Sequence, residues 1–275
     1  MAQQHLHWLH GANPIGKVML SNMAAYGAES SVQEIYHIWF ADGSNYPGTQ
    51  NIRHRRRWFA EGLAAAHAQM TPSEQRLLVE YKPFEPAFYH TDIADWGMAL
   101  ELARAAGPQA KVLVDTGHHY QAQNIEQIVA WLLDLDMLGG FHFNDRRYAD
   151  DDLTMGSIDP YQAFRIFHEI RFYQWETGKR PDIAFMIDQS HNLKDKIEAM
   201  IQTVNMAMEL YAKAALVRHD VLAGHQAKAN LIDAEACLQD AFATDVRPAI
   251  EQWRASRGLP VQPLAAYRES GYHGR

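Results

Sequence analysis

The sequence has a single cysteine, Cys237, among 275 residues. One thiol cannot form an intramolecular disulfide, so a disulfide-stapled scaffold is excluded and a reducing, cytoplasmic environment is expected. Long apolar runs are also missing. None reaches the ~18 residues that a membrane-spanning helix needs, and no signal-peptide pattern opens the chain. We therefore expect no membrane-embedded part.

Positive charge and nucleotide-binding motifs are scarce as well. The formal net charge of −8 argues against a general nucleic-acid binder. The one dense basic run, RHRRRW at 53–58, is expected on a solvated or subunit-facing helix surface rather than at a phosphate site. No GxGxxG or GxxxxGK[ST] motif follows an apolar run, so a nucleotide-binding sheet lacks its main signature.

What the chain does have is a regular alternation of apolar, β-rich runs with helical patterns. Near-continuous apolar strands that alternate with helices predict a parallel sheet in an α/β fold. We expect helices over 51–70, from Thr91 or Asp92 to 106, and over 121–135, 160–176, 193–223 and 231–257. The expected strands lie in the runs IYHIWFAD, RLLVEYK, KVLVDTGHH, MLGGFHFND and DIAFMIDQS.

This order of elements fits either an open doubly wound sheet or a (β/α)₈ TIM barrel. Polar side chains at the ends of many strands favour the barrel, whose active site is built in that way. Residues 35–258 supply fewer than eight strand–helix units, so we expect an incomplete barrel domain over this range. Residues 1–34 form an atypical lead-in and 259–275 a tail.

Four of the apolar runs carry a chemically capable side chain near the strand end. Taken singly, such a residue is more often a core or capping residue than a ligand. The ends of parallel strands lie on one side of the sheet, however, so these groups are expected to converge. Carboxylates brought together repel unless a cation compensates them, and carboxylates with one imidazole suit Mn²⁺, Mg²⁺ or Co²⁺. The predicted metal ligands are Glu80, Asp115, His142 and Asp188.

A second cation site is predicted beside the first. His118 follows Asp115 by three residues, and Asp150 and Asp152 lie in the loop after His142. Glu80 is a candidate bridge between the two cations. The alternative is that the aspartates at 150–152 only cap a turn. In the metal interpretation, Asp151 is the solvated residue between the two ligands.

Lys82 follows Glu80 by two residues and is expected on the same side of its strand. A lysine in a carboxylate-rich pocket can bind a substrate oxygen. The alternative is a structural counter-ion for the same carboxylates.

Five longer motifs of the chain together resemble the L-rhamnose isomerase family, in particular the bacterial type that also acts on D-allose and other aldoses. The resemblance extends from about Trp39 to about Leu216. It is carried by FADGSNYPGTQNIRHR, LVEYKPFEPAFYHTDIADWG, VLVDTGHH, GGFHFNDRRYADDDLTMGSIDPYQ and MIDQSHNLK.

The resemblance implies a metal-dependent aldose–ketose isomerase on a TIM barrel, which moves hydrogen between C1 and C2 of an open-chain sugar. It implies two divalent ions, with Mn²⁺ ahead of Mg²⁺, Co²⁺ or Zn²⁺. One is held by Glu80, Asp115, His142 and Asp188, and the other by His118, Asp150 and Asp152 with Glu80 shared. We nominate Lys82, Asp188 and Asp150 as catalytic residues, a monosaccharide as substrate, and a homo-oligomer, since tetramers are usual in the family.

Residues 1–31 do not resemble the family's first three strand–helix units, so the chain is expected to correspond to strands 4–8 of the barrel. Two alternatives follow. The chain could be an inactive metal-binding fragment, or it could be another two-metal barrel enzyme, an epimerase or a hydrolase.

Overall fold

The computed structural model describes residues 51–71, 74–83, 92–189 and 193–272. Ile52–Glu85 and Thr91–Arg275 form one compact unit, which holds the sheet. The predicted strand over 35–42 lies outside the described residues.

The described sheet has four parallel strands, and their order in space follows their order in the chain. This confirms the predicted α/β class and four of the five predicted strands. The strands are short and mostly apolar, as expected for strands covered by helices. They are β1 (Leu77–Glu80), β2 (Ala110–Asp115), β3 (Leu138–Phe143) and β4 (Ala184–Ile187).

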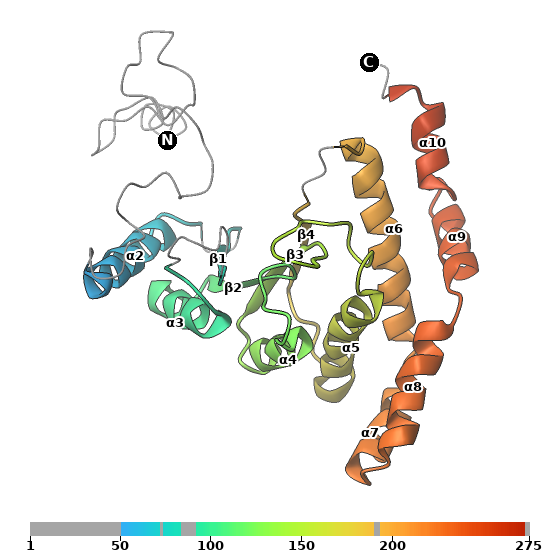
Figure 1. Ribbon diagram of the computed structural model, residues 1–275, viewed down its shortest axis with the longest axis horizontal. Helices are drawn as coiled ribbons and strands as arrows, with labels where there is room; N and C mark the ends of the chain where they lie inside the picture. Colours follow the sequence, from blue (N-terminus) through green and yellow to red (C-terminus); the bar gives the residue numbers. More distant parts are fainter. Residues whose placement is uncertain (1–50, 72–73, 84–91, 190–192, 273–275) are drawn as a thin grey trace. The chain divides into compact units, whose positions relative to one another are not determined.

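A helix follows each strand, and Figure 1 shows these helices succeeding one another along one side of the sheet. At the start of each helix an Asp or Asn side chain accepts a backbone N–H, the usual way to satisfy the free donors of the first turn. The helices are α3 (Trp96–Ala106), α4 (Ile125–Asp134), α5 (Pro160–Thr177) and α6 (Lys196–Ala215).

The core lies between the sheet and these helices. Val112 and Val114 of β2 are fully buried, as is Phe141 of β3. Phe143 packs at 5.3 Å from the ring of Phe167 on α5. Side chains at alternate strand positions are thus used for packing, which leaves the positions between them for the opposite side of the sheet.

The C-terminal region is divided into more helices than the sequence pattern indicates. The predicted helix 193–223 is two helices, separated at Leu216–Arg218, and the predicted helix 231–257 is broken before Arg247. Within the predicted tail, residues 263–269 form a further helix. The observed elements are α7 (His219–Ala227), α8 (Leu231–Ala243), α9 (Arg247–Ser256) and α10 (Pro263–Glu269).

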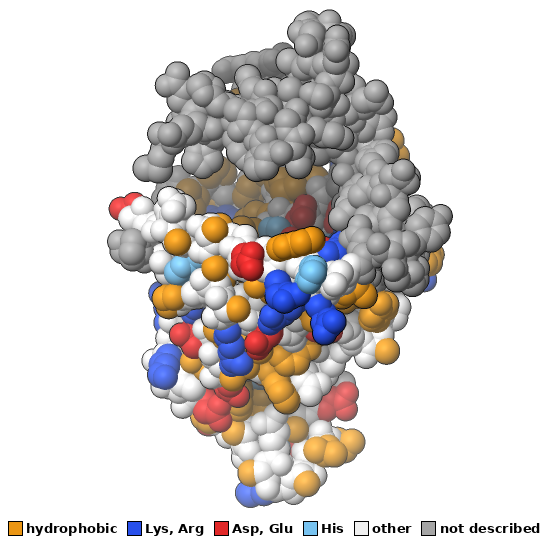
Figure 2. Space-filling model, turned by 90° about the vertical axis from the view of Figure 1, so that its left-hand side faces the viewer, with side chains coloured by type: hydrophobic (Ala, Val, Ile, Leu, Met, Phe, Trp, Pro, Cys, Tyr) orange, Lys and Arg blue, Asp and Glu red, His pale blue; other side chains and the backbone are white. Residues whose placement is uncertain are grey.

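The helix α2 (Ile52–His67) contains the basic run and has no buried residue. Figure 2 views the molecule from the side on which α2 lies in Figure 1, and Lys and Arg side chains gather on this face. The prediction of an exposed basic helix is confirmed. Among the described residues, no helix combines the length and apolar character needed to cross a bilayer.

Candidate metal centre

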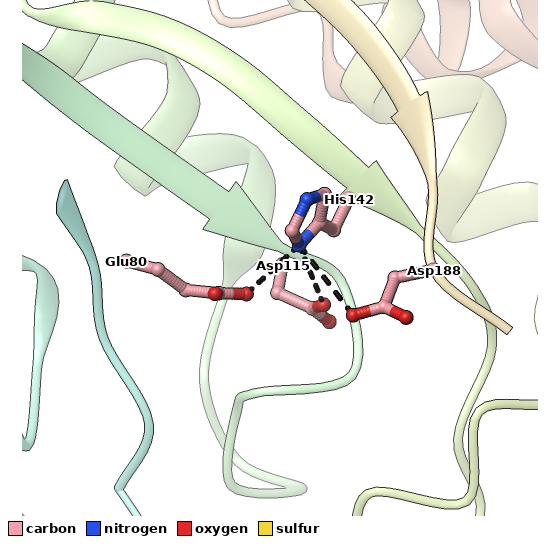
Figure 3. Close-up of side chains that lie close together, drawn as sticks. All are labelled: Glu80, Asp115, His142 and Asp188. Atoms are coloured by element: carbon pink, nitrogen blue, oxygen red, sulfur yellow. Dashed lines mark hydrogen bonds and ion pairs between the residues drawn. The ribbon is translucent and has the colours of Figure 1, made fainter. Parts of the chain in front are cut away.

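Four side chains converge at the carboxyl ends of the strands (Figure 3). Glu80 and Asp115 are the last residues of β1 and β2, His142 is next to last in β3, and Asp188 follows β4 directly. The pairing of Asp115 with His142 in the β2–β3 register brings two of them level. One ligand atom from each of the four lies within 4.8 Å of the others.

His142 lies at the centre of this first group. Its Nδ1 is 3.0 Å from Oε1 of Glu80, 3.6 Å from Oδ2 of Asp188 and 3.7 Å from Oδ2 of Asp115. The hydrogen bond with Glu80 is the main cause that raises the pKa of His142. Burial opposes ionisation of Glu80, but the hydrogen bond from His142 and the nearby imidazoles outweigh it and lower the Glu80 pKa.

Asp115 is the buried member of the group, with no exposed surface. Burial, aided by the charge of Glu80, raises its pKa to about 6. Three carboxylates therefore share one imidazole in a partly desolvated space, so negative charge remains in excess even when His142 is protonated. A divalent cation is the simplest compensation, and this ligand set suits one.

A second group adjoins the first and is formed by Asp115, His118 and Asp150. Nε2 of His118 is 3.2 Å from Oδ2 of Asp150 and 3.9 Å from Oδ2 of Asp115. Although burial disfavours the imidazolium, the hydrogen bond to Asp150 and the charges of Asp115, Asp150 and Glu80 raise the His118 pKa to about 9. A cation bound at Nε2 would therefore have to displace a proton.

The structure brings most of the predicted ligands together, with two differences in detail. Asp115 is the residue common to both groups, whereas Glu80 was the predicted bridge; Oε1 of Glu80 nevertheless lies 3.5 Å from Nδ1 of His118. Asp152, a predicted ligand of the second cation, does not belong to either group among the described residues. Its backbone has a positive φ of 47°, which an alternating strand pattern does not anticipate.

Lys82 lies at the second group. Its Nζ is 2.6 Å from Oδ2 of Asp150, and both side chains are largely buried. Asp151 is not simply solvated as predicted, since its carboxylate accepts hydrogen bonds from the backbone N–H groups of Arg147 and Tyr148. The acidic loop thus has divided roles: Asp151 shapes the turn, while Asp150 faces Lys82 and His118.

One residue in contact with this cluster that the sequence pattern did not single out is Asn144. Its Nδ2 donates to Oδ1 of Asp115 at 2.9 Å, and the backbone N–H of Gly117 donates to the same oxygen at 2.7 Å. The other oxygen, Oδ2, is buried and has no hydrogen-bond partner. These contacts leave Oδ2 to face both groups, as expected for a carboxylate oriented toward a cation. The available signal was an amide at a strand end, two residues after His142.

No protein-family model matches the chain. The chain is 42% identical over 238 residues to "Probable sugar isomerase R00627" of Rhizobium meliloti (strain 1021) and 40% identical over 238 residues to "Probable sugar isomerase mlr5709" of Mesorhizobium japonicum. Each match covers 86% of this chain and 55% of the relative, so the chain spans about half the length of the curated relatives it matches.

Among solved structures, protein SMc04130 from Sinorhizobium meliloti 1021 matches with a TM-score of 0.42 and 17% identity, over 58% of this chain and 59% of that one. A likeness of this size carries no argument about fold or function. The identity to the two curated relatives is much higher and extends over most of this chain. The chain is homologous to proteins described as probable sugar isomerases.

Proposed function

We propose that this chain carries the metal-binding side of an aldose–ketose sugar isomerase built on a (β/α)₈ barrel, with L-rhamnose and L-rhamnulose as the substrate pair. The observation that carries the proposal is the convergence of Glu80, Asp115, His142 and Asp188 from four successive strand ends. The homology to probable sugar isomerases supports the reaction class. The described strands are parallel, and the helices that follow them lie along one side of the sheet. This arrangement supports the proposed barrel.

The ligand chemistry fits divalent cations. Oxygen donors with one imidazole in each group suit Mn²⁺, and also Mg²⁺ or Co²⁺, better than metals that prefer thiolates. When bound, such cations would polarise the oxygens at C1 and C2 of an open-chain sugar.

The chain's own residues would hold and orient the sugar. Asp188 is the open member of the first group, with 53% of its side chain exposed, whereas Asp115 is enclosed. The sugar is therefore expected on the Asp188 side, where this carboxylate can accept a hydrogen bond from a hydroxyl group. Lys82, held by Asp150, can donate a hydrogen bond to a sugar oxygen and neutralise charge that develops there.

Hydrogen transfer between C1 and C2 can proceed in two ways. One is a hydride shift, and the other is removal and return of a proton by a base through a cis-enediol. In the second route Asp150 and Asp188 are the candidate bases. Exchange of the transferred hydrogen with deuterated solvent would favour the base route, and full retention would favour the hydride shift.

The test has two stages, because metal binding and turnover are separate properties of this chain. Calorimetry with Mn²⁺ on the metal-depleted protein should show binding. The loaded protein should then convert L-rhamnose to L-rhamnulose, with D-allose as a comparison sugar and Asp115→Asn as the inactive control. Metal binding without turnover would contradict isomerase activity of this chain alone, and phosphoester hydrolysis would favour a two-metal hydrolase instead.

A further inference from the structure

Tyr81 lies between Glu80 and Lys82 at the end of β1, yet its side chain is only 1% exposed. Neighbouring residues of an extended chain point to opposite sides, so Tyr81 points away from the two site residues that flank it. Its hydroxyl lies 2.6 Å from Nε2 of His119, which is fully buried. The two rings meet edge to face at 87°, with their centroids 5.3 Å apart.

The backbone of Tyr81 makes a second contact with the same loop. Its carbonyl oxygen is 3.0 Å from Nδ1 of His118, the residue next to His119. An imidazole that donates from Nδ1 to a carbonyl presents Nε2 as the ligand nitrogen, and such contacts fix the orientation of metal-binding histidines. Here Nε2 of His118 is the nitrogen that faces Asp115 and Asp150.

Tyr81, which directly follows β1, thus contacts two consecutive residues of the loop after β2. The hydroxyl bond to His119 fixes where the loop lies relative to β1, and the carbonyl bond to His118 fixes the orientation of the ligand ring. We propose that Tyr81, through its bond to His119, is a positioning residue that sets His118 for cation binding through Nε2. The inference rests on the proposed metal-binding function.

The competing explanation is that Tyr81 and His119 only fill the core. The two explanations differ in what the loss of the hydroxyl group would do. A packing role predicts that Tyr81→Phe, which keeps the ring, leaves cation binding unchanged or weakens all of it together with the fold. A positioning role predicts a selective loss at the group that contains His118, while the group around His142 keeps its cation.

The experiment titrates Co²⁺ into the metal-depleted full chain, by calorimetry and by visible absorption, which reports the cobalt ligands. We expect two bound equivalents in the wild type. In Tyr81→Phe, one equivalent should bind about 10–100-fold more weakly, the range measured for partners that orient metal ligands, with a change in its absorption band. The other equivalent should keep its affinity and spectrum. Tyr161→Phe, which removes the hydroxyl of a partly buried tyrosine on α5, should match the wild type.

A second pair of variants tests the same bond from the His119 side and does not depend on the folding of Tyr81→Phe. His119→Leu removes the partner of the hydroxyl group and should reproduce the selective loss, whereas His119→Gln offers an amide to that group and should restore most of the affinity. Wild-type affinity for both equivalents in Tyr81→Phe and His119→Leu would overturn the inference, as would equal weakening of both equivalents. Absence of cobalt binding by the wild type would instead overturn the proposed function, and the inference with it.

Discussion

The two ends of the sheet treat charge in opposite ways. At the amino ends of the strands, two ion pairs each join a cation to an aspartate that is exposed to solvent. Arg76 pairs with Asp182, and Lys111 pairs with Asp136 at 2.8 Å. The side chains of these aspartates are 87% and 86% exposed. Such pairs hold surface charge at little cost and contribute little stability.

At the carboxyl ends the charged side chains are more crowded, and three carboxylates surround one imidazole. Asp115 has no exposed surface, and it lies with Glu80 and Asp188 around His142. Burial of Asp115 beside the charge of Glu80 disfavours its ionised form, and a bound cation would relieve this cost. This difference between the two ends of the sheet is the one expected if the proposed cations bind at the carboxyl ends.

The largest loss of cation affinity is expected from Asp115→Asn. Asparagine keeps an acceptor for Asn144 and Gly117, but it places an amide N–H where Oδ2 faces both groups. Cation affinity should fall by about 100-fold or more at both positions, since the loss of a ligand should exceed the 10–100-fold cost of losing a partner that orients one. Calorimetric titration with Mn²⁺ measures this.

The same variant tests whether the charge of Asp115 lowers the stability of the metal-free protein. Since burial raises the pKa of Asp115, the charged form is disfavoured in the metal-free protein. Metal-free Asp115→Asn should therefore unfold at the same temperature as the wild type or higher. A clear loss of thermal stability without metal would show that Asp115 is a structural residue, and the contrast between the two ends of the sheet would disappear.

A smaller loss of cation affinity is expected from Gly117→Ala. A Cβ at this position would lie 2.6 Å from Oδ1 of Asn144, 2.9 Å from Oδ1 of Asp150 and 3.2 Å from Oδ1 of Asp115. The added methyl group should displace these side chains, lower cation affinity about 10-fold and reduce the free energy of unfolding by about 1–3 kcal/mol. Gly62→Ala is the matched control, because it lies in α2 with nothing within 4 Å and should stabilise the protein by about 0.5–1 kcal/mol.

The stability of the metal-free protein should fall as the pH rises. Burial raises the folded-state pKa of Asp115 from its ordinary 3.8 to about 6, and the neighbouring carboxylates outweigh burial and raise the pKa of His118 from 6.5 to about 9. The proton on each group therefore stabilises the metal-free fold, and this stability is lost as pH rises, from about 4 to 6 for Asp115 and from about 6.5 to 9 for His118. The second step should amount to roughly 3 kcal/mol, at about 1.4 kcal/mol per pKa unit.

Denaturant unfolding at pH 6.5 and pH 9, with and without Mg²⁺, measures this slope. Saturating Mg²⁺ should flatten it, because the cation replaces the proton on His118. Calorimetry at pH 7.5 in two buffers of different ionisation enthalpy should then show about one proton released as the second cation binds. Binding without proton release would contradict the assignment of His118 as a ligand.

The sequence predicts those elements of the fold that depend on neighbouring residues, and it does not predict those that depend on contacts between distant residues. The described strands were predictable because burial under helices demands near-continuous apolar runs, such as 110–115. The start of α3 was not. Thr91, Asp92 and Asp95 are all residues that can cap a helix; Asp95 caps it, while Asp92 binds Arg55 of α2. The three residues are equivalent as helix caps in the sequence. The contact of Asp92 with Arg55, which lies far away in the chain, is not visible there.

The C-terminal helices show the same limit. No proline or glycine marks the break between α6 and α7, where Val217 is buried. In α9 the proline Pro248 stands in the first turn, where a proline is tolerated, and it therefore marks the start of a helix and not its interior.

In the site, residue types and strand ends were enough to nominate ligands, because parallel strands bring their ends to one side. Which carboxylate is common to both groups was not predictable. It depends on the hydrogen bonds that hold Oδ1 of Asp115 and on the loop conformation that turns Asp152 to a positive φ. The bond from Asn144 joins the ends of two strands, so it arises only when β2 and β3 lie side by side.

The smallest effect is expected at the amino end, from Asp182→Asn. This change removes one partner of an ion pair whose aspartate is largely exposed, and Arg76 keeps its hydrogen bond of 3.0 Å to the carbonyl of Gly139. The free energy of unfolding should fall by less than about 1 kcal/mol, and by less still in high salt. Cation affinity and the pH slope should equal those of the wild type. A change in cation affinity here would mean that the two ends are coupled through the strands, and charge at the amino end would then be part of the metal centre.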